Sequence, residues 1–294
     1  MTDDLLSITD LRVAFGTVQD PVEVVHGVGL TVSPGQRVAL VGESGSGKSV
    51  TARAVMQLDT DARLSGSIRL DGRELIGASA RFVRGIRGSR VGLVFQDPLT
   101  ALNPVMTIGW QITQPLVFRG VSARDARRRG IELLERLGVQ DAADRFDAYP
   151  HEFSGGMRQR VVIAIAVIAE PALLIADEPT TALDVQVQAQ VLALLDEIAT
   201  ERGMGVLLIT HDLGIVAGFA DDVVVMRSGA VVEHADTDTL FADPQHTYTR
   251  GLIGAVPRID ADPAVRLVSV TDLEVTGIQG TGLEVTDLEK EDAR

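Results

Sequence analysis

The amino-acid sequence predicts an α/β fold built on a parallel β-sheet, with an antiparallel β subdomain and an inserted α-helical subdomain. Three observations predict this fold. Short apolar segments alternate with longer segments of helical spacing, the pattern of strands joined by crossover helices. Residues 173–176 are apolar at every position, as expected for a strand covered on both faces. Residues 5–15 and 22–32 instead alternate apolar and polar side chains, which favours antiparallel strands with one exposed face.

The elements follow in order along the chain. The two alternating segments are expected to pair across a turn at residues 16–21, and Asp71 and Gly72 mark a second hairpin after residues 67–70. Further strands are expected at residues 37–41, 91–95, 173–176, 206–209, 223–226 and 230–233. Helices are expected at residues 50–58, 123–137, 157–169 and 185–202, with helical spacing also at 116–120. Residues 98–153 therefore form the predicted helical subdomain.

Composition excludes several classes of protein. The chain has 294 residues, 45% of them apolar, which is enough for a sizeable core in one or two domains. It has no cysteine, which excludes disulfides and cysteine-ligated metal clusters. The net charge of −14 argues against a nucleic-acid partner. The acidic start lacks the basic residues of a signal peptide, and the longest apolar run, residues 161–176, is interrupted by Glu170 and Pro171. We therefore expect a soluble, intracellular protein.

A glycine-rich loop between a predicted strand and a predicted helix carries the clearest chemistry. It matches the phosphate-binding pattern G-x-x-x-x-G-K-[ST]. Its glycines allow backbone N–H groups to surround an anion, and the dipole of the following helix favours negative charge there. The lysine can reach β- and γ-phosphates, and the last hydroxyl can hold Mg²⁺. A turn that binds nothing is the alternative, but the terminal Lys-Ser pair and the flanking elements disfavour it. The candidate residues are Gly42, Glu43, Ser44, Gly45, Ser46, Gly47, Lys48, Ser49 and Val50.

Polar side chains follow three other predicted strands at the point where each strand ends. They are Gln96, then Asp177 and Glu178, and then His211. Ligands of parallel sheets bind at the carboxyl ends of the strands, so these side chains and the loop are expected to converge. Asp177 is expected to bind Mg²⁺, and Glu178 to orient or deprotonate an attacking water. A capped strand end would look the same, and the glycine-rich loop is what favours the catalytic interpretation.

The stretch Phe153-Ser154-Gly155-Gly156-Met157-Arg158-Gln159-Arg160 resembles the signature motif of ABC ATPases. The common form reads L-S-G-G-Q, and here phenylalanine replaces the leucine and methionine replaces the glutamine. An ordinary helix cap is the alternative reading of this stretch, but it does not explain the spacing to the strand at 173–176. The resemblance implies a P-loop NTPase (RecA-like) core. It also implies that Ser154, Gly155 and Gly156 face the γ-phosphate held by the loop of an opposing subunit.

The same resemblance implies roles for further residues. Gln96 looks like the Q-loop glutamine that senses Mg²⁺ and the water, and His211 looks like the switch histidine at the γ-phosphate. Residues 181–184 look like the D-loop, with Asp184 near the nucleotide. Phe15 and Val25 are candidates for the surface that stacks on adenine, although strand residues of this kind usually belong to the core. The implied cofactors are ATP and Mg²⁺, with Ser49, Gln96 and Asp177 as the metal ligands.

Within this family, three stretches resemble the importers of oligopeptides, dipeptides and nickel: residues 96–104, the F-S-G-G-M-R-Q-R form of the signature, and residues 246–252. The iron–sulfur cluster of many members cannot be present without cysteine. The resemblance implies an ATP-hydrolysing importer subunit, first for peptides and otherwise for nickel or another small solute. Its partners would be a second ATPase, two membrane permeases and an extracytoplasmic solute-binding protein, at the cytoplasmic face of the membrane. A soluble ABC ATPase of translation or DNA repair is the alternative.

The resemblance covers residues 5–257, so the ATPase domain is expected at residues 1–257. Residues 258–294 are acidic and poor in large apolar side chains, and are expected to be largely disordered. Residues 267–275 nevertheless repeat the pattern of residues 5–13. This repeat is either the remnant of a second ATPase domain or a coincidence.

Overall fold

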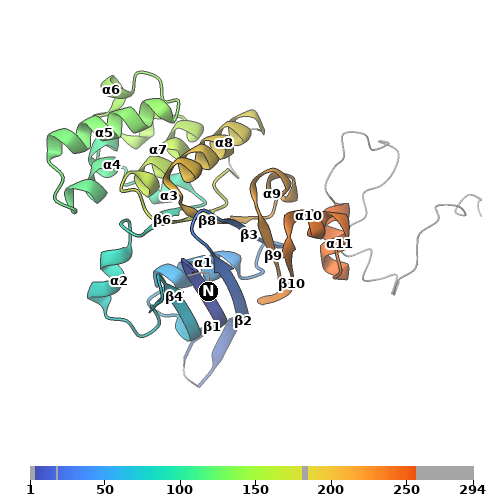
Figure 1. Ribbon diagram of the computed structural model, residues 1–294. Coiled ribbons are helices and arrows are strands. Elements are labelled where there is room, and N and C mark those ends of the chain that lie inside the picture. Colours follow the sequence, from blue (N-terminus) through green and yellow to red (C-terminus); the bar gives the residue numbers. More distant parts are fainter. Residues whose placement is uncertain (1–3, 18, 181–184, 256–294) are drawn as a thin grey trace, which may run out of the picture. The chain divides into compact units, whose positions relative to one another are not determined.

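The computed structural model describes residues 4–17, 19–180 and 185–255 (Figure 1). The chain divides into two units, Met1–Asp243 and Pro244–Arg294. The first unit contains both β-sheets and the candidate site. In the second unit the structure describes one helix, α11 (Thr247–Gly254), which the side chain of His246 caps by accepting a hydrogen bond from the N–H of Tyr248. The expected tail at residues 258–294 and the repeat within it lie outside the described residues.

A six-stranded sheet forms the centre of the first unit. Its order is β10-β9-β3-β8-β7-β6, and all neighbours pair in parallel except the edge pair β9 and β10. All residues of β7 and β8 are buried, which confirms the prediction of strands covered on both faces. The strands are β3 (Arg37–Val41), β6 (Val91–Val94), β7 (Leu173–Asp177), β8 (Gly205–Thr210), β9 (Asp222–Arg227) and β10 (Ala230–Asp236).

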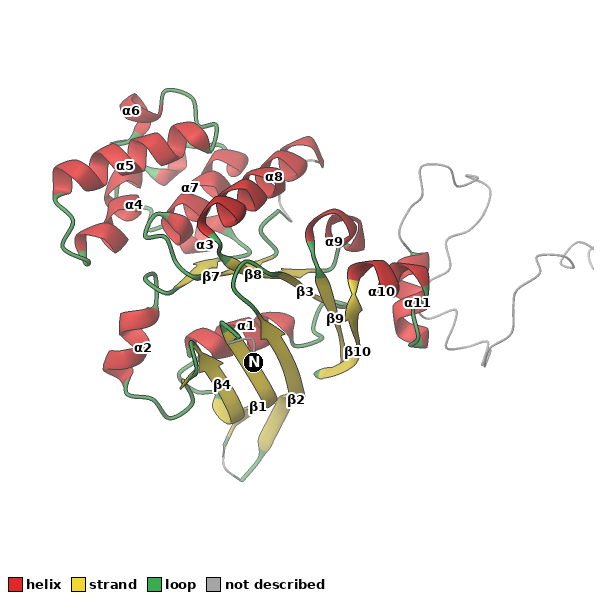
Figure 2. Ribbon diagram, in the orientation of Figure 1, coloured by secondary structure: helices red, strands yellow, loops and turns green. Residues whose placement is uncertain are grey.

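The first unit also contains a four-stranded antiparallel sheet of order β2-β1-β4-β5 (Figure 2). Its strands are β1 (Leu6–Gly16), β2 (Pro21–Val32), β4 (Arg63–Leu70) and β5 (Arg73–Glu74). The predicted hairpins therefore form where the sequence placed them. The register of β1 shifts between Ile8 and Leu11, where Asp10 has a φ of 46°. This bulge allows Ile8 and Leu11 both to point into the core, at 2% and 0% exposure.

Helices cover the central sheet and form the inserted subdomain. Beside the sheets lie α1 (Lys48–Met56), α2 (Ala80–Ile86), α8 (Val185–Arg202), α9 (Leu213–Phe219) and α10 (Thr237–Ala242). The inserted subdomain is drawn in green in Figure 1, with α4, α5, α6 and α7 grouped together. Residues 98–153 contain α3 (Pro98–Ala101), α4 (Ile108–Val117), α5 (Ala123–Arg136), α6 (Ala142–Arg145) and the 3₁₀ helix Pro150–Glu152, and α7 (Gly155–Val167) follows directly.

Two glycines allow the helices of this subdomain to close around one aromatic ring. A Cβ at Gly109 of α4 would overlap the ring of Phe146, and a Cβ at Gly130 of α5 would lie 2.9 Å from it. Phe146 is 2% exposed and belongs to the same core cluster as Ile112 and Leu134. The chain immediately before Phe146, including α6, is therefore held in a fixed position against α4 and α5.

The sequence predicted the start of this subdomain less well. Of the helical stretch expected at residues 116–120, only the first two residues are helical, and they end α4. This helix begins at Ile108, where the side chain of Thr107 caps it by accepting a hydrogen bond from the N–H of Trp110. Pro115 lies within α4. Similarly, the helix expected from Met157 begins two residues earlier, at Gly155, because Ser154 is its cap.

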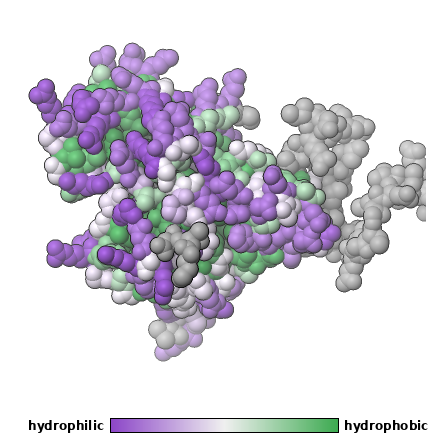
Figure 3. Space-filling model, viewed as in Figure 1, coloured by the Kyte–Doolittle hydropathy of each residue, from purple (hydrophilic) through white to green (hydrophobic). Residues whose placement is uncertain are grey.

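The surface is largely hydrophilic in the view of Figure 3, with apolar side chains between the charged ones over the helical subdomain. The exposed large apolar residues include Leu99, Trp110 and Phe118, all in this subdomain. None of the helices in the described part of the chain combines the length and apolar character that crossing a bilayer requires.

Candidate nucleotide-binding site

The loop at residues 42–49 joins β3 to α1 and curls around a lysine. Lys48 is the first residue of α1 and is only 4% exposed. Its Nζ donates hydrogen bonds of 2.8 Å to the carbonyl oxygens of Gly42 and Glu43. Gly47 caps the helix at a φ of 100°, which glycine adopts without strain. The backbone N–H groups of the first turn of α1 have no partner within the helix and are available to an anion.

The loop also requires a glycine where it approaches the sheet. Gly42 has a φ of 151°, and a Cβ at this position would collide with the carbonyl oxygen of Met226 in β9. Gly45, at a φ of 81°, has nothing within 4 Å of the corresponding position. The loop is thus seated against β9 at Gly42 and stands open at Gly45, where Glu43 and Ser44 are also exposed and Ser46 is buried.

Burial and nearby carboxylates act on Lys48 in opposite directions. Burial lowers the pKa of Lys48 from its ordinary value, while the charges of Glu178, Asp177 and Glu43 oppose that change. The ammonium group therefore lies at the meeting point of the loop and the acidic end of β7. An anionic phosphate chain at the loop would add negative charge beside a cation that is already desolvated.

The end of β7 places a buried carboxylate next to the last residue of the loop at 42–49. Asp177 is 7% exposed, and its Oδ1 accepts a hydrogen bond of 2.9 Å from the hydroxyl of Ser49. Burial raises the pKa of Asp177, the Ser49 hydrogen bond opposes that change, and the charge of Glu178 adds to it. A carboxylate whose ionisation is penalised in this way would be stabilised by a bound cation.

These two oxygen ligands fit Mg²⁺. A hydroxyl and a carboxylate are hard donors of the kind that Mg²⁺ prefers, and Mg²⁺ usually takes its remaining ligands from water and substrate phosphates. Within residues 4–17, 19–180 and 185–255 no group of three His, Cys, Asp or Glu could hold a metal by itself. The metal at Ser49 and Asp177 would therefore depend on the nucleotide for further ligands.

Three strand ends converge on Glu178. Its Oε2 accepts a hydrogen bond of 2.8 Å from Nε2 of Gln96, and its Oε1 lies 3.1 Å from Nδ1 of His211. The Glu178 side chain is 11% exposed, whereas His211 is 55% exposed. Glu178 has a φ of 46°, and its N–H donates to the carbonyl oxygen of Ile209 in β8. The backbone is held in a strained conformation that aims the carboxylate between Gln96 and His211.

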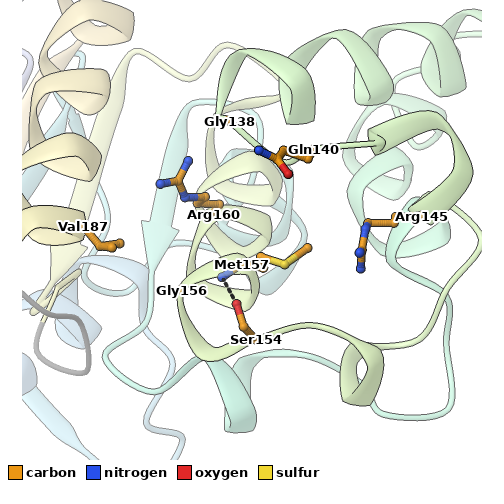
Figure 4. A pocket seen from close by; sticks show the side chains of 8 residues that line it. All are labelled: Gly138, Gln140, Arg145, Ser154, Gly156, Met157, Arg160 and Val187. Atoms are coloured by element: carbon orange, nitrogen blue, oxygen red, sulfur yellow. Dashed lines mark hydrogen bonds between the residues drawn. The ribbon is translucent and has the colours of Figure 1, made fainter.

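The signature stretch, residues 153–160, borders a pocket that the loop at residues 42–49 does not line. Ser154 caps α7, and its hydroxyl oxygen accepts a hydrogen bond of 3.3 Å from the N–H of Met157. Nothing lies within 4 Å of the position that a Cβ would take at Gly155. Ser154 and Gly156 border a pocket of about 250 Å³ (Figure 4). None of the residues that line this pocket belongs to the loop at 42–49.

The two residues expected to contact adenine differ in position. Val25 lies in β2 with 0% exposure and belongs to the core cluster that both sheets and α1 share. It therefore offers no surface to a ligand, and this assignment is wrong. Phe15 is partly buried and pairs in register with Val22, which is 59% exposed. The contact of Phe15 with adenine remains a prediction. Val50 is partly buried on α1. Asp184 lies outside the described residues.

Sequence reasoning missed one residue that holds His211. Asp212 caps α9: its Oδ1 accepts a hydrogen bond of 2.9 Å from the N–H of Gly214, and its own N–H donates to Oγ1 of Thr210. These bonds fix the chain on both sides of His211. The signal was present, because an aspartate before an apolar helical run is a common N-cap.

Comparison with known proteins agrees with this geometry. Residues 25–181 match the family described as ABC transporter, and residues 232–275 match the oligopeptide/dipeptide transporter, C-terminal region. The chain is 51% identical over 269 residues to the oligopeptide transport ATP-binding protein OppD of Mycobacterium bovis, covering 90% of this chain and 44% of OppD. It is 49% identical over 264 residues to a putative peptide import ATP-binding protein of Brucella abortus, covering 89% of this chain and 80% of that protein.

Solved structures give the same result. One is the dimeric, post-hydrolysis ATP-binding cassette MJ0796 bound to ADP and Pi, with a TM-score of 0.72 and 26% identity over 79% of this chain and 98% of that chain. Another is cbiO1 from Clostridium perfringens, part of an ABC transporter complex, with a TM-score of 0.70 and 29% identity over 82% and 92%. The chain spans less than half the length of OppD but most of the Brucella protein and of both cassettes. It belongs to the ABC transporter family, in the group that carries the oligopeptide/dipeptide C-terminal region.

Proposed function

We propose that this chain binds and hydrolyses ATP to power an ABC importer, with peptides as the cargo. The observation that carries the proposal is the carboxylate of Glu178, held between Gln96 and His211 beside the Ser49–Asp177 pair. The names of the relatives, which refer to oligopeptide transport and peptide import, support the cargo class. The matched oligopeptide/dipeptide region favours this function over a soluble ABC ATPase of translation or DNA repair.

The loop at residues 42–49 would bind the phosphate chain. Its backbone N–H groups and the N-terminus of α1 would bind the β-phosphate, and Lys48 would compensate the charge of the β- and γ-phosphates. Ser49, Asp177 and the amide oxygen of Gln96 would hold Mg²⁺, which when bound would neutralise charge on the phosphate oxygens. Phe15 is proposed to stack on adenine.

Glu178 would act on the attacking water. Its carboxylate accepts a proton from the water as the water oxygen bonds to the γ-phosphorus, and the bond from that phosphorus to the β–γ bridging oxygen breaks. The products are ADP and phosphate. His211, next to the same carboxylate, would contact the γ-phosphate, and Gln96 would report its presence to the helical subdomain that begins at α3.

A complete site requires two ATPase domains. The signature pocket contains no residue of the chain's own glycine-rich loop, so Ser154, Gly155 and Gly156 are proposed to face the nucleotide of a second domain. Bound ATP would then hold two domains together, and hydrolysis would release them. Asp184, in the D-loop outside the described residues, is proposed to lie at this interface. The ATPase domain is proposed to extend over residues 1–257, including α11.

The proposed partners are a second ATPase, which is a second copy or a different chain, two membrane permeases and an extracytoplasmic solute-binding protein. The chain would work at the cytoplasmic face of the membrane. The test is a pull-down of tagged protein from detergent-solubilised native membranes, with mass spectrometry of the bound proteins. We expect two multi-span permeases and a second ATPase. Recovery of ribosomal or DNA-repair proteins without permeases would contradict the importer.

A further inference from the structure

The pocket beside the signature contains a positively charged side chain to which neither the sequence pattern nor the proposed function gives a role. Arg145, the last residue of α6, lines this pocket together with Ser154, Gly156 and Met157. Figure 4 shows Arg145 and Arg160 on either side of Met157. The two arginines come from different elements, and their surroundings differ.

Arg160 is used by the fold. Its Nη1 donates to the carbonyl oxygen of Leu137 at the end of α5, and its Nη2 donates to Oε1 of Gln190 in α8 at 3.2 Å. The chain passes so close at Gly138 that a Cβ there would collide with Nη1 of Arg160. The guanidinium group of Arg160 therefore joins α5, α7 and α8 and is not free to bind a ligand.

Arg145 has no such structural use. Among the described residues no hydrogen bond or ion pair holds its guanidinium group, although neighbouring arginines such as Arg127 and Arg128 pair with acidic side chains. Its backbone is nevertheless fixed, because the next residue is Phe146, which is buried between α4 and α5. A cation on a fixed backbone, without a protein partner and partly buried beside a pocket, is suited to an anionic ligand.

Met157 explains why the pocket would need this cation. The signature pattern places glutamine here, whose amide can donate hydrogen bonds, whereas the thioether of methionine is only a weak acceptor. Ser154 uses its hydroxyl oxygen to accept from the N–H of Met157, which leaves its O–H as a donor. Arg145 adds up to five N–H donors at the same pocket.

We propose that Arg145 binds phosphate oxygens of the nucleotide held by the opposing ATPase domain, and that it supplies the donors that Met157 lacks. This inference rests on the proposed function, because the nucleotide reaches the pocket only in a pair of domains. Arg145 thus acts in trans, and its loss leaves the chain's own ATP-binding loop intact.

The test uses the Glu178→Gln chain with the ATPase partner that co-purifies with it. The ATP concentration at half-maximal closure of the pair is measured by light scattering. Arg145→Ala is expected to raise that concentration at least about tenfold, since charge-assisted hydrogen bonds to phosphate are lost. For Arg145→Lys, the ATP concentration at half-maximal closure is expected to lie between that of the parent and that of Arg145→Ala, because lysine keeps the charge but not the fork of donors. Arg129→Ala, a change of an exposed arginine on α5 away from the pocket, is the matched control and is expected to close like the parent.

Binding of ATP to the isolated chain is measured in parallel and is expected to be the same with and without the Arg145 side chain. Unchanged closure of the Arg145→Ala pair would overturn the proposal. Equal weakening of ATP binding by the isolated chain would also overturn it, as would weakening of a pair that forms without ATP, since Arg145 would then contact protein. If the parent pair never closes with ATP, the proposed function fails first, and this inference fails with it.

Discussion

Alanine at Gly42 should destabilise the fold more than alanine at Gly45, although both glycines belong to the same loop. Both have a positive φ, 151° and 81°, so either substitution strains the backbone by about 1–3 kcal/mol. Only at Gly42 would the new Cβ collide with main chain, the carbonyl oxygen of Met226, because Gly45 has open space around it. Overpacking of this kind costs a further 1–3 kcal/mol or so.

The expected free energies of unfolding are therefore lowered by about 2–6 kcal/mol for Gly42→Ala and about 1–3 kcal/mol for Gly45→Ala. For a unit of this size, about 1 kcal/mol changes Tm by roughly 2–4 °C, so the two variants should differ by about 2–12 °C. The assay is thermal unfolding of the nucleotide-free chain, followed by circular dichroism. Equal melting temperatures would refute the conclusion that the loop is seated against β9 at Gly42.

Other predictions concern ligands and pH. Lys48→Ala should lose most ATP affinity, measured by calorimetry, because the loop loses its buried cation; unchanged affinity would exclude this loop as the phosphate site. Gly155→Ala should melt like the parent, since a Cβ there meets nothing within 4 Å, yet should close poorly with ATP in light scattering; normal closure would remove Gly155 from the interface. Burial raises the pKa of Asp177, so in the nucleotide-free chain this carboxyl should cost stability, relative to the Asp177→Asn variant, as the pH rises from the ordinary value of 3.8 through the higher folded pKa. Asp177→Asn should remove that loss and melt higher than the parent at pH 7 without Mg²⁺; a lower melting temperature would contradict the account.

The central sheet and its functional edge were predictable because strong local patterns specify them. Leu173 to Ala176 are apolar throughout, and the polar residues Asp177 and Glu178 follow directly. Once the strands are parallel, their carboxyl ends must share one edge, which brings Gln96 and His211 to Glu178. The particular hydrogen bonds were not predictable, because they depend on the left-handed backbone at Glu178.

The helical subdomain was harder to predict for physical reasons. Pro115 suggests a break in α4, yet the helix continues through it. Trp110 and Phe118 are 48% and 84% exposed, which obscures the periodicity of apolar residues that usually marks a helix. The position of Arg145 beside Met157 depends on how Phe146 packs between Gly109 and Gly130, and no local pattern indicates that contact.

The assignment of Val25 to the adenine contact was wrong for a different reason. Resemblance to the family suggested a surface contact with adenine, although apolar residues in strands usually belong to the core. In the structure Val25 pairs with Val13 and both have 0% exposure. Alternation along β2 from Val28 and Val32 would put Val25 on the opposite face. The register shift between the pairs Leu11–Val28 and Arg12–His26 turns Val25 inward, and no local pattern indicates that shift.

The most direct test of the account is ATP turnover by the Glu178→Gln chain together with its ATPase partner. Glutamine keeps the shape of the side chain and can still bond to Gln96 and His211, but it cannot accept a proton from water. We expect ATP binding like that of the parent, phosphate release at least about a hundredfold slower, and accumulation of the closed pair. Phosphate release at the parent's rate would contradict the assignment of Glu178 as the catalytic base.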